Sequence, residues 1–88
     1  KQMAYKDPLT SLFNRRYFFE TAEKLYLTAL REKREIAVLM CDIDHFKKIN
    51  DNYGHDTGDI VIKNTAEILS SNIRKNDIVA RYGGEEFV

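Results

Sequence analysis

The sequence predicts an α/β fold, a single small domain in which helices flank a central sheet. Residues 36–41 form an unbroken apolar run (IAVLMC), which is typical of a strand buried on both faces of a sheet. The segments before and after this run repeat apolar residues with helical spacing. A glycine pair at residues 83–84 separates two short strand-like segments, as in a hairpin.

The composition is that of a globular domain and excludes several other classes. The chain has 88 residues, of which 43% are hydrophobic and 32% charged. Its 14 basic and 14 acidic residues cancel, so we expect no nucleic-acid binding through a basic surface. No apolar run approaches the roughly 20 residues of a membrane span, so we expect no direct membrane contact in this segment. Cys41 is the single cysteine, which excludes a disulfide framework and fits a small buried strand residue in a reducing cytoplasm.

The first third of the chain predicts a turn followed by a long helix. Residues 7–10 (DPLT) are expected to turn, because Pro8 disfavours helix at the preceding residue. Asn14 is a suitable N-cap for a helix that runs to about Lys33. The apolar stripe of this helix consists of Phe18, Ala22, Leu25 and Ala29. The arginines at residues 15–16 oppose the helix dipole, which indicates a tertiary partner for one of them; two solvated arginines are the alternative.

The middle of the chain predicts the central strand and a short helix. The strand is expected over residues 36–43. Asp44 would then cap a helix from His45 to about Asn52, and Gly54 would follow the end of that helix. The inner face of this helix is expected to consist of Phe46, Ile49 and Tyr53.

The last third predicts another long helix and the hairpin. Asp56 or Thr57 is expected to cap a helix that runs to about Lys75. The apolar stripe of this helix consists of Ile62, Ala66, Leu69 and Ile73. Strands are expected at residues 78–82 and 85–88, and the glycine pair between them would form a two-residue turn with positive φ.

Acidic side chains gather where the central strand ends. Asp42 and Asp44 would point the same way if the strand continues through both, and Glu85 would converge on Asp42 if the hairpin lies beside this strand. Carboxylates without histidine or cysteine suit Mg²⁺; solvated carboxylates or helix caps are the alternative. A calcium EF-hand is excluded, because the sixth and twelfth places counted from Asp42 hold Lys47 and Tyr53 in place of Gly and Glu. Neither a P-loop motif nor a GxGxxG motif is present.

Three sequence motifs together resemble those of a known family. In chain order they are residues 7–16 (DPLTSLFNRR), residues 42–59 (DIDHFKKINDNYGHDTGD) and residues 83–87 (GGEEF). They resemble the GGDEF family of bacterial diguanylate cyclases in sequence and spacing. The resemblance covers residues 7–88 and implies the first half of the family's domain, with residues 1–6 as the end of an upstream linker or signalling helix. It implies a ferredoxin-like α+β sandwich, similar to the palm of nucleotidyl cyclases and polymerases and truncated after the hairpin.

The resemblance implies a nucleotidyltransferase that joins two GTP molecules into cyclic di-GMP, releases pyrophosphate and depends on Mg²⁺ or Mn²⁺. Asp42, the Ile43 carbonyl and Glu85 would hold the metal. Glu86 would bind metal as well or activate the attacking 3′-hydroxyl, which makes Asp42, Glu85 and Glu86 the expected catalytic residues.

The resemblance also implies nucleotide contacts. Asn50 and Asp59 match the guanine readers, and a carboxylate accepts from the guanine N1–H and exocyclic amine together. Lys47 and the amides of His45 and Phe46 would hold phosphate oxygens at a helix start. The RxxD pair Arg74 and Asp77 matches a site where the product cyclic di-GMP inhibits the enzyme; a helix-end arginine and a turn aspartate are the alternative.

The resemblance finally implies a homodimer, with one GTP on each subunit, and an N-terminal sensor or signalling domain in the parent protein. The expected location is the cytoplasm, or the cytoplasmic part of a membrane-bound sensor. A module that binds GTP or cyclic di-GMP without turnover is the alternative function, and a fragment that only dimerises is a third. We expect the chain ending at Val88 to be catalytically silent and an extension of roughly 75–80 residues to restore activity.

Overall fold

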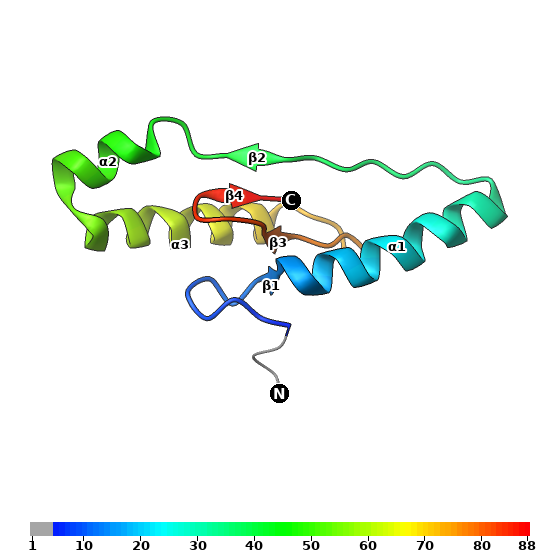
Figure 1. Cartoon of the computed structure of the whole chain (residues 1–88). Coiled ribbons are helices and arrows are strands. Elements are labelled where there is room, and N and C mark those ends of the chain that lie inside the picture. The colour runs from blue at the N-terminus through cyan, green and yellow to red at the C-terminus, as the bar shows by residue number, and fades with distance from the viewer. Residues whose placement is uncertain (1–4) are drawn as a thin grey trace.

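The computed structural model describes residues 5–88, in which three helices surround a mixed four-stranded sheet of very short strands (Figure 1). The helices are α1 (Arg15–Glu32), α2 (Phe46–Tyr53) and α3 (His55–Ser71). The strands are β1 (Phe13–Asn14), β2 (Cys41–Asp42), β3 (Ala80–Arg81) and β4 (Glu86–Phe87), in the spatial order β1-β3-β4-β2. β1 and β3 are parallel, whereas β4 is antiparallel to both of its neighbours. The predicted fold class, a sheet flanked by helices, is confirmed.

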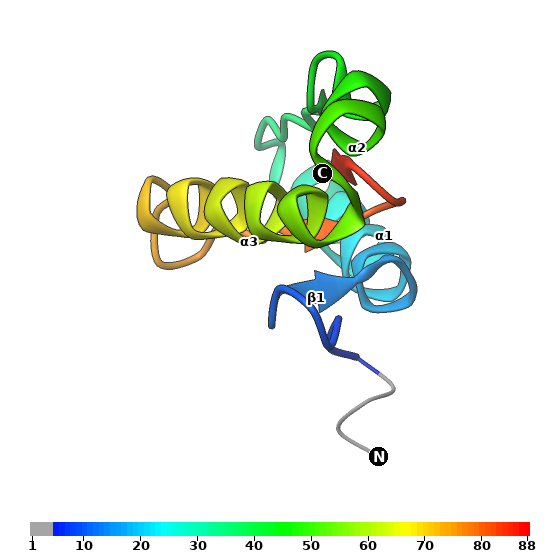
Figure 2. The same cartoon turned by 90° about the vertical axis from the view of Figure 1, so that its left-hand side faces the viewer.

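A small apolar core lies where α3 packs on the sheet. Among the described residues, the buried apolar side chains are Leu12, Ile62, Ala66, Ala80 and Phe87. Figure 2 shows α3 lying between α2 and β1. The predicted stripe of α3 is confirmed for Ile62, Ala66 and the partly buried Leu69. Ile73, however, follows the end of the helix and is 38% exposed.

Helix α1 forms as its sequence predicts. The Asn14 side chain accepts a hydrogen bond from the Tyr17 amide at 2.9 Å, as an N-cap does. At the other end Lys33 adopts the left-handed conformation, and its amide donates to the carbonyls of Ala29 and Leu30.

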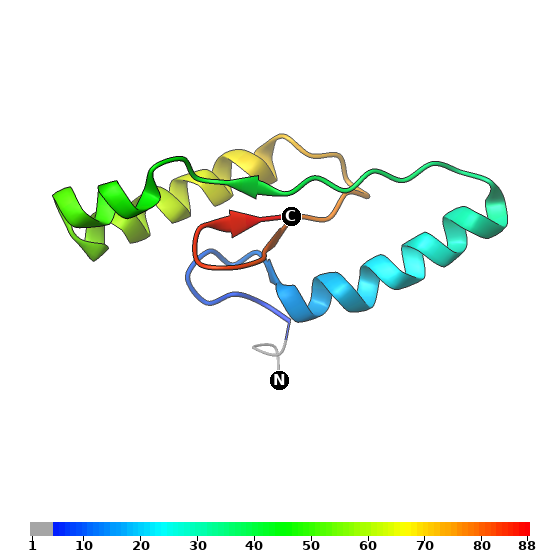
Figure 3. The same ribbon diagram turned by 45° about the horizontal axis from the view of Figure 1, so that its top comes forward.

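The central strand is much shorter than predicted. Only Cys41 and Asp42 pair with β4, and the apolar residues before them are exposed, Val38 at 66% and Leu39 at 69%. Figure 3 shows the chain extended from α1 to β2 and standing apart from α1. The prediction of a strand over residues 36–43 buried on both faces is therefore wrong for this chain. Burial on both faces needs adjacent strands and covering helices, and within residues 5–88 the segment 36–40 has no ladder partner.

The junction of α2 and α3 also differs from the prediction. His45, not Asp44, is the N-cap of α2; it has φ 58° and makes no side-chain cap bond. Gly54, with φ 90°, ends α2 and directly precedes α3. Because the chain turns at this single residue, Asp56 and Thr57 lie inside the first turn of α3 and do not cap it.

Two further details of the helices are corrected. Tyr53 is 71% exposed, so it is not part of the inner face of α2. Helix α3 ends at Ser71, short of Lys75, because the Asn72 side chain donates to the Ile68 carbonyl at 2.7 Å and closes the last turn.

The β3–β4 connection is a hairpin, but not the predicted two-residue turn. The amides of Tyr82 and Gly83 donate to the Glu86 carbonyl at 2.7 and 3.3 Å, so the turn comprises residues 83–85. Among the described glycines, Gly54 alone has positive φ. The predicted dihedral role of the glycine pair is therefore wrong. The strands are also shorter than the predicted 78–82 and 85–88.

The expected linker or helix end at residues 1–6 lies mostly outside the described residues. Tyr5 is in a turn, and Lys6 forms an isolated antiparallel bridge with Phe13. Within residues 5–88, no helix has the length and apolar character needed to cross a bilayer.

Candidate functional site

The acidic residues meet where β2 pairs with β4. The antiparallel register places Asp42 directly opposite Glu86, and the Ile43 amide donates to the Glu85 carbonyl at 3.2 Å. The hairpin thus lies beside the central strand, which is the condition under which the sequence analysis expected an acidic side chain of the hairpin to converge on Asp42. Opposite residues of an antiparallel pair share one face, with Cβ atoms about 4.5–5.5 Å apart. The register therefore brings Asp42 together with Glu86, where the sequence analysis expected Glu85.

The Glu86 carboxylate lies against the hairpin turn. A Cβ added at Gly83 would collide with Glu86 Oε1 and come within 3.4 Å of its Cδ. Gly83 therefore permits a close approach of this carboxylate to the backbone. The position of the turn and the position of the Glu86 carboxylate are linked by direct contact.

The carboxylates have the right chemistry for a hard divalent cation. Asp44 lies in the turn after β2 and is exposed, so it does not share a continuing strand with Asp42. Within residues 5–88, no cluster of three or more acidic, histidine or cysteine side chains could enclose a metal. Mg²⁺ is commonly held by one or two carboxylates and completed by phosphate oxygens and water. The cross-strand pair Asp42–Glu86 fits a site of that kind, with Glu85 and the Ile43 backbone adjacent.

The start of α2 lies a few residues beyond this pair. His45 in the left-handed conformation leads into Phe46, the first residue of the helix. The first amides of a helix have no partner within the helix and carry the positive end of its dipole. Lys47 is exposed in the same turn. The amides and Lys47 form a region that favours anions.

Asn50 and Gly58 form the contact between α2 and α3. A Cβ at Gly58 would overlap Asn50 Oδ1 and come within 3.2 Å of Phe46 Cζ. Asn50 Oδ1 is buried without a hydrogen-bond partner among the described residues, which is unusual for a buried polar atom. Asp59 follows on α3 and is exposed. Two oxygen acceptors thus lie at this helix junction.

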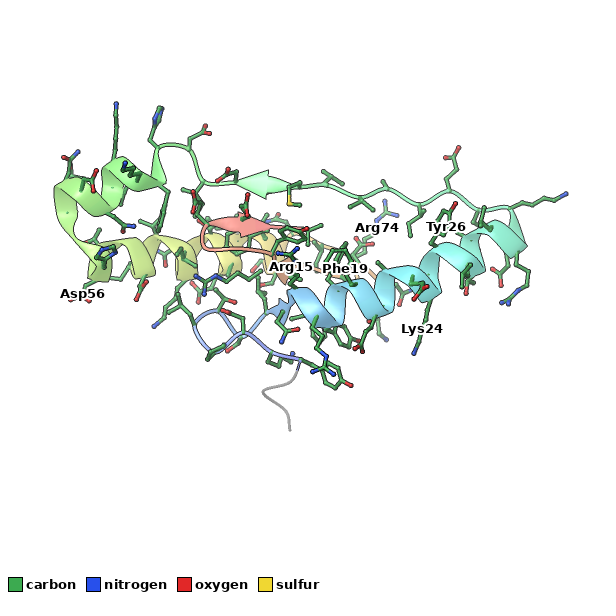
Figure 4. The ribbon with its side chains drawn as sticks, in the orientation of Figure 1. Arg15, Phe19, Lys24, Tyr26, Asp56 and Arg74 are labelled. Atoms are coloured by element: carbon green, nitrogen blue, oxygen red, sulfur yellow. The ribbon has the colours of Figure 1, made fainter. Side chains whose placement is uncertain are left out.

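The RxxD pair is located elsewhere. Asp77 Oδ2 accepts from the Arg74 amide at 3.0 Å, and the Asp77 amide donates to the Arg74 carbonyl at 3.1 Å. This turn leaves the Arg74 side chain exposed. Figure 4 shows Arg74 beyond the end of α3, far from Asp56 at its start. The structure therefore places Arg74 at the opposite end of α3 from the α2–α3 junction.

An apolar groove of about 650 Å³ runs between α1 and residues 36–39. Its lining includes the predicted stripe of α1, Phe18, Ala22, Leu25 and Ala29. All of the predicted site residues are among the described residues 5–88, and Asp77 alone of them lines this groove. The groove thus contains neither member of the acidic pair nor the start of α2, although it reaches β2 and β4 through Cys41 and Phe87.

One of the two arginines at the start of α1 has the tertiary partner that the sequence predicts. The Arg15 guanidinium lies 4.3 Å from the centre of the Tyr82 ring, just before the hairpin, and 5.7 Å from that of Phe19. Figure 4 shows Arg15 and Phe19 together at this end of α1. Arg16 instead forms an exposed pair with Glu20 at 3.4 Å.

The sequence analysis missed Arg81. Its guanidinium contacts Asp7, 74 residues away, with Nη1 3.2 Å from both carboxylate oxygens. Burial alone would raise the pKa of Asp7, but hydrogen bonds from Thr10 and the charge of Arg81 bring that pKa below its ordinary value. The sequence does place an arginine two residues before the glycine pair, which could have indicated a contact between Arg81 and the turn. Nothing in the sequence marked Asp7 as its partner.

Comparison with known proteins identifies the family. Residues 4–88 match the family model described as "Diguanylate cyclase, GGDEF domain". The chain belongs to the GGDEF family. The resemblance of its three motifs is thereby confirmed over almost the whole chain.

Relatives and solved structures agree with this assignment. The probable diguanylate cyclase DgcT of Escherichia coli K12 is 49% identical over 87 residues, which cover 99% of this chain and 19% of that protein. The GGDEF domain of PA1120 from Pseudomonas aeruginosa superposes with a TM-score of 0.91 at 42% identity, over 94% of this chain and 48% of that one. The GGDEF domain of DgcB from Caulobacter crescentus, solved in complex with c-di-GMP, has a TM-score of 0.84 at 39% identity, over 96% and 48% of the two chains. The chain therefore spans about a fifth of the curated relative and about half of each solved chain.

Proposed function

We propose that the intact domain, meaning this chain extended to the length of the solved GGDEF domains, is a diguanylate cyclase. The supporting observation is the cross-strand pair Asp42–Glu86, next to the start of α2, in a chain of this family. The 3′-hydroxyl oxygen of one GTP would attack the α-phosphorus of another, and the bond to the leaving pyrophosphate would break. Repeating the step closes cyclic di-GMP, so that two GTP molecules yield one product and two pyrophosphates.

The acidic residues would serve the reacting groups. Asp42, the Ile43 carbonyl and Glu85 would hold Mg²⁺ or Mn²⁺, which when bound neutralises phosphate charge and orients the reactants. Glu86 would accept the proton of the attacking hydroxyl or add a further metal contact. Its position opposite Asp42 and its contact with the backbone at Gly83, which holds the carboxylate at the site, support either role.

The α2–α3 junction would bind the nucleotide. Asn50 and Asp59 would accept hydrogen bonds from guanine, and the unpartnered Asn50 Oδ1 supports a need for such a donor. Lys47 and the amides of His45 and Phe46 would hold phosphate oxygens. Because each subunit would bind one GTP and the reaction joins two, the active form would be a homodimer.

The remaining assignments concern regulation and context. Arg74 and Asp77 would bind cyclic di-GMP as an inhibitor; the turn that presents the exposed Arg74 side chain supports this. The catalytic domain would begin at Asp7, and residues 1–6 would end a linker from an N-terminal sensor or signalling domain. The domain would act in the cytoplasm, alone or as part of a membrane-bound sensor.

Incubation of the intact domain with GTP and Mg²⁺, followed by chromatographic separation of nucleotides, tests the proposal. We expect cyclic di-GMP from the intact domain and none from the 88-residue chain, whose residues 36–40 are uncovered. If the intact domain binds nucleotide in a titration but forms no product, it is a binding module. The solved complex of DgcB with c-di-GMP, a GGDEF domain that binds the dinucleotide, is the observation behind that second candidate.

A further inference from the structure

Arg81 joins the N-terminal turn to the hairpin turn. Its guanidinium donates from Nη1 to Asp7 and from Nη2 to the Gly84 carbonyl at 2.9 Å. Nε lies 3.2 Å from the carbonyls of both Gly83 and Gly84. Figures 1 and 3 both show the N-terminal turn beside the β3–β4 turn. One planar donor group thus holds both segments.

The Asp7 end of this contact is itself rigidly held. The Thr10 amide and hydroxyl donate to Asp7 Oδ2 at 2.9 and 2.8 Å. The Asp7 backbone donates to the Leu12 carbonyl at 2.7 Å and accepts from the Ser11 amide at 2.8 Å. The Asp7 side chain is 15% exposed and that of Arg81 19%. Arg81 is therefore anchored to a fixed point.

The hairpin end leads to the proposed site. Arg81 holds the carbonyls of the turn, and Gly83 of that turn lies against the Glu86 carboxylate. A shift of the turn would move this carboxylate relative to Asp42. We propose that the Asp7–Arg81 pair is a positioning device, which sets the Gly83–Gly84 turn and through it the Glu86 carboxylate. The inference extends the proposed cyclase function and rests on it for its catalytic consequence.

A pair that only stabilised the fold would behave differently. Lysine at position 81 keeps the positive charge toward Asp7, but a single ammonium lacks the fork that reaches Asp7 and both glycine carbonyls. Asparagine at position 7 keeps an acceptor for Thr10 but removes the charge that anchors Arg81. Arg16→Lys is a matched control, because Arg16 forms an ion pair on the surface, where the two side chains are 69% and 50% exposed.

The experiment compares the intact wild-type domain with Arg81→Lys, Asp7→Asn, the double variant and Arg16→Lys. We expect Arg81→Lys to lower kcat by about ten- to a hundredfold, as misplacement of a reacting group does, with KM for GTP little changed. The double variant should be little worse than Arg81→Lys, because both substitutions interrupt one connection. Arg16→Lys should match the wild type. A fall in kcat that merely follows the fall in Tm across all variants would overturn the proposal.

A second readout does not depend on activity. Hydrogen exchange of the Tyr82 and Gly83 amides, which are bonded to the Glu86 carbonyl, should accelerate in Arg81→Lys and Asp7→Asn by a larger factor than exchange in α3, which reports only the overall loss of stability. Unchanged exchange at the turn would overturn the positioning role. If the wild-type domain makes no cyclic di-GMP, the cyclase proposal fails, and this readout still decides whether the pair positions the turn.

Discussion

The sequence predicts strands at residues 36–43 and at residues 85–88, and the apolar side chains of residues 36–40 are exposed whereas Phe87 of the second strand is buried. In the exposed segment, residues 36–40, the side chains of Ile36, Val38, Leu39 and Met40 are 45–69% exposed. Phe87 in β4 is 1% exposed. β4 lies between β2 and β3, whereas the exposed segment has no ladder partner within residues 5–88. An apolar run therefore shows which residues are suited to burial, and neighbouring strands decide whether burial occurs.

The two parts also differ in their polar contacts. In the hairpin corner, made of Asp7, Arg81, Gly83, Gly84 and Glu86, hydrogen bonds and close contacts connect the N-terminal turn to the acidic pair. The exposed segment has no comparable network among the described residues. Substitutions that disturb these contacts should therefore change function, whereas those in the exposed segment of this chain should change little.

The largest effect is expected at Glu86. Glu86→Gln in the intact domain should lower cyclic di-GMP synthesis by about 10²–10⁴-fold, because it removes the proton acceptor or metal contact, while GTP still binds. Glu35→Gln, the same change beside the exposed segment, is the control and should leave turnover unaffected. Chromatography of products and a GTP titration measure the two quantities. Near wild-type turnover in Glu86→Gln would contradict its role.

The next effect concerns burial. In the 88-residue chain, Phe87→Ala should lower the free energy of unfolding by about 3–5 kcal/mol, the cost of a cavity in a core. Leu39→Ala should change it by less than about 0.5 kcal/mol, as exposed positions do. Urea unfolding followed by helical circular dichroism checks both. In the intact domain we expect Leu39→Ala to lower the free energy of unfolding as well. If Leu39→Ala and Phe87→Ala lowered it equally in the 88-residue chain, residues 36–40 would be packed in solution and the comparison would fail.

A smaller effect is expected at the turn. Gly83→Ala should displace the Glu86 carboxylate and lower kcat by about tenfold. Because that carboxylate is the flexible end of a side chain, the stability cost should lie at the low end of the usual overpacking cost, about 1 kcal/mol. Gly84→Ala is the matched control, because a Cβ there meets nothing within 4 Å. Steady-state kinetics and urea unfolding of the intact domain separate the two costs. The same kcat in both variants would show that the contact with Gly83 does not matter.

The smallest effect is a pH dependence at Asp7. Its lowered pKa means that its charge stabilises the folded state above about pH 4, and that this contribution is lost as pH falls through the lowered pKa. Asp7→Asn should lower the free energy of unfolding by about 1 kcal/mol at pH 7, and the difference from wild type should shrink toward pH 2–3. Urea unfolding at pH 7 and pH 3 measures this difference. A gap that stays constant with pH would show that the charge of Asp7 is not involved.

Local signals were sufficient for the parts of the fold that depend on adjacent residues. Asn14 caps α1 and residues 7–10 turn as predicted, because both rely on bonds within a few residues. The helical period also predicted Ile62, Ala66 and Leu69 as the inward stripe of α3, whereas no residue of the predicted α1 stripe is fully buried and Ile73 lies beyond the end of α3. The cap of α2 and the start of α3 were not predictable in this way, because Gly54 alone carries the turn between the two helices.

The sequence by itself determined the family and the approximate positions of the three helices, since these depend on motif order, spacing and local backbone preference. Only the tertiary structure decided that Asp42 faces Glu86, that Gly83 is needed for contact with a carboxylate, and that Arg81 reaches Asp7. Strand register and contacts across 74 residues depend on how separate segments pack. The same reason explains residues 36–40: their apolar character is local, but their burial depends on neighbours elsewhere in the chain.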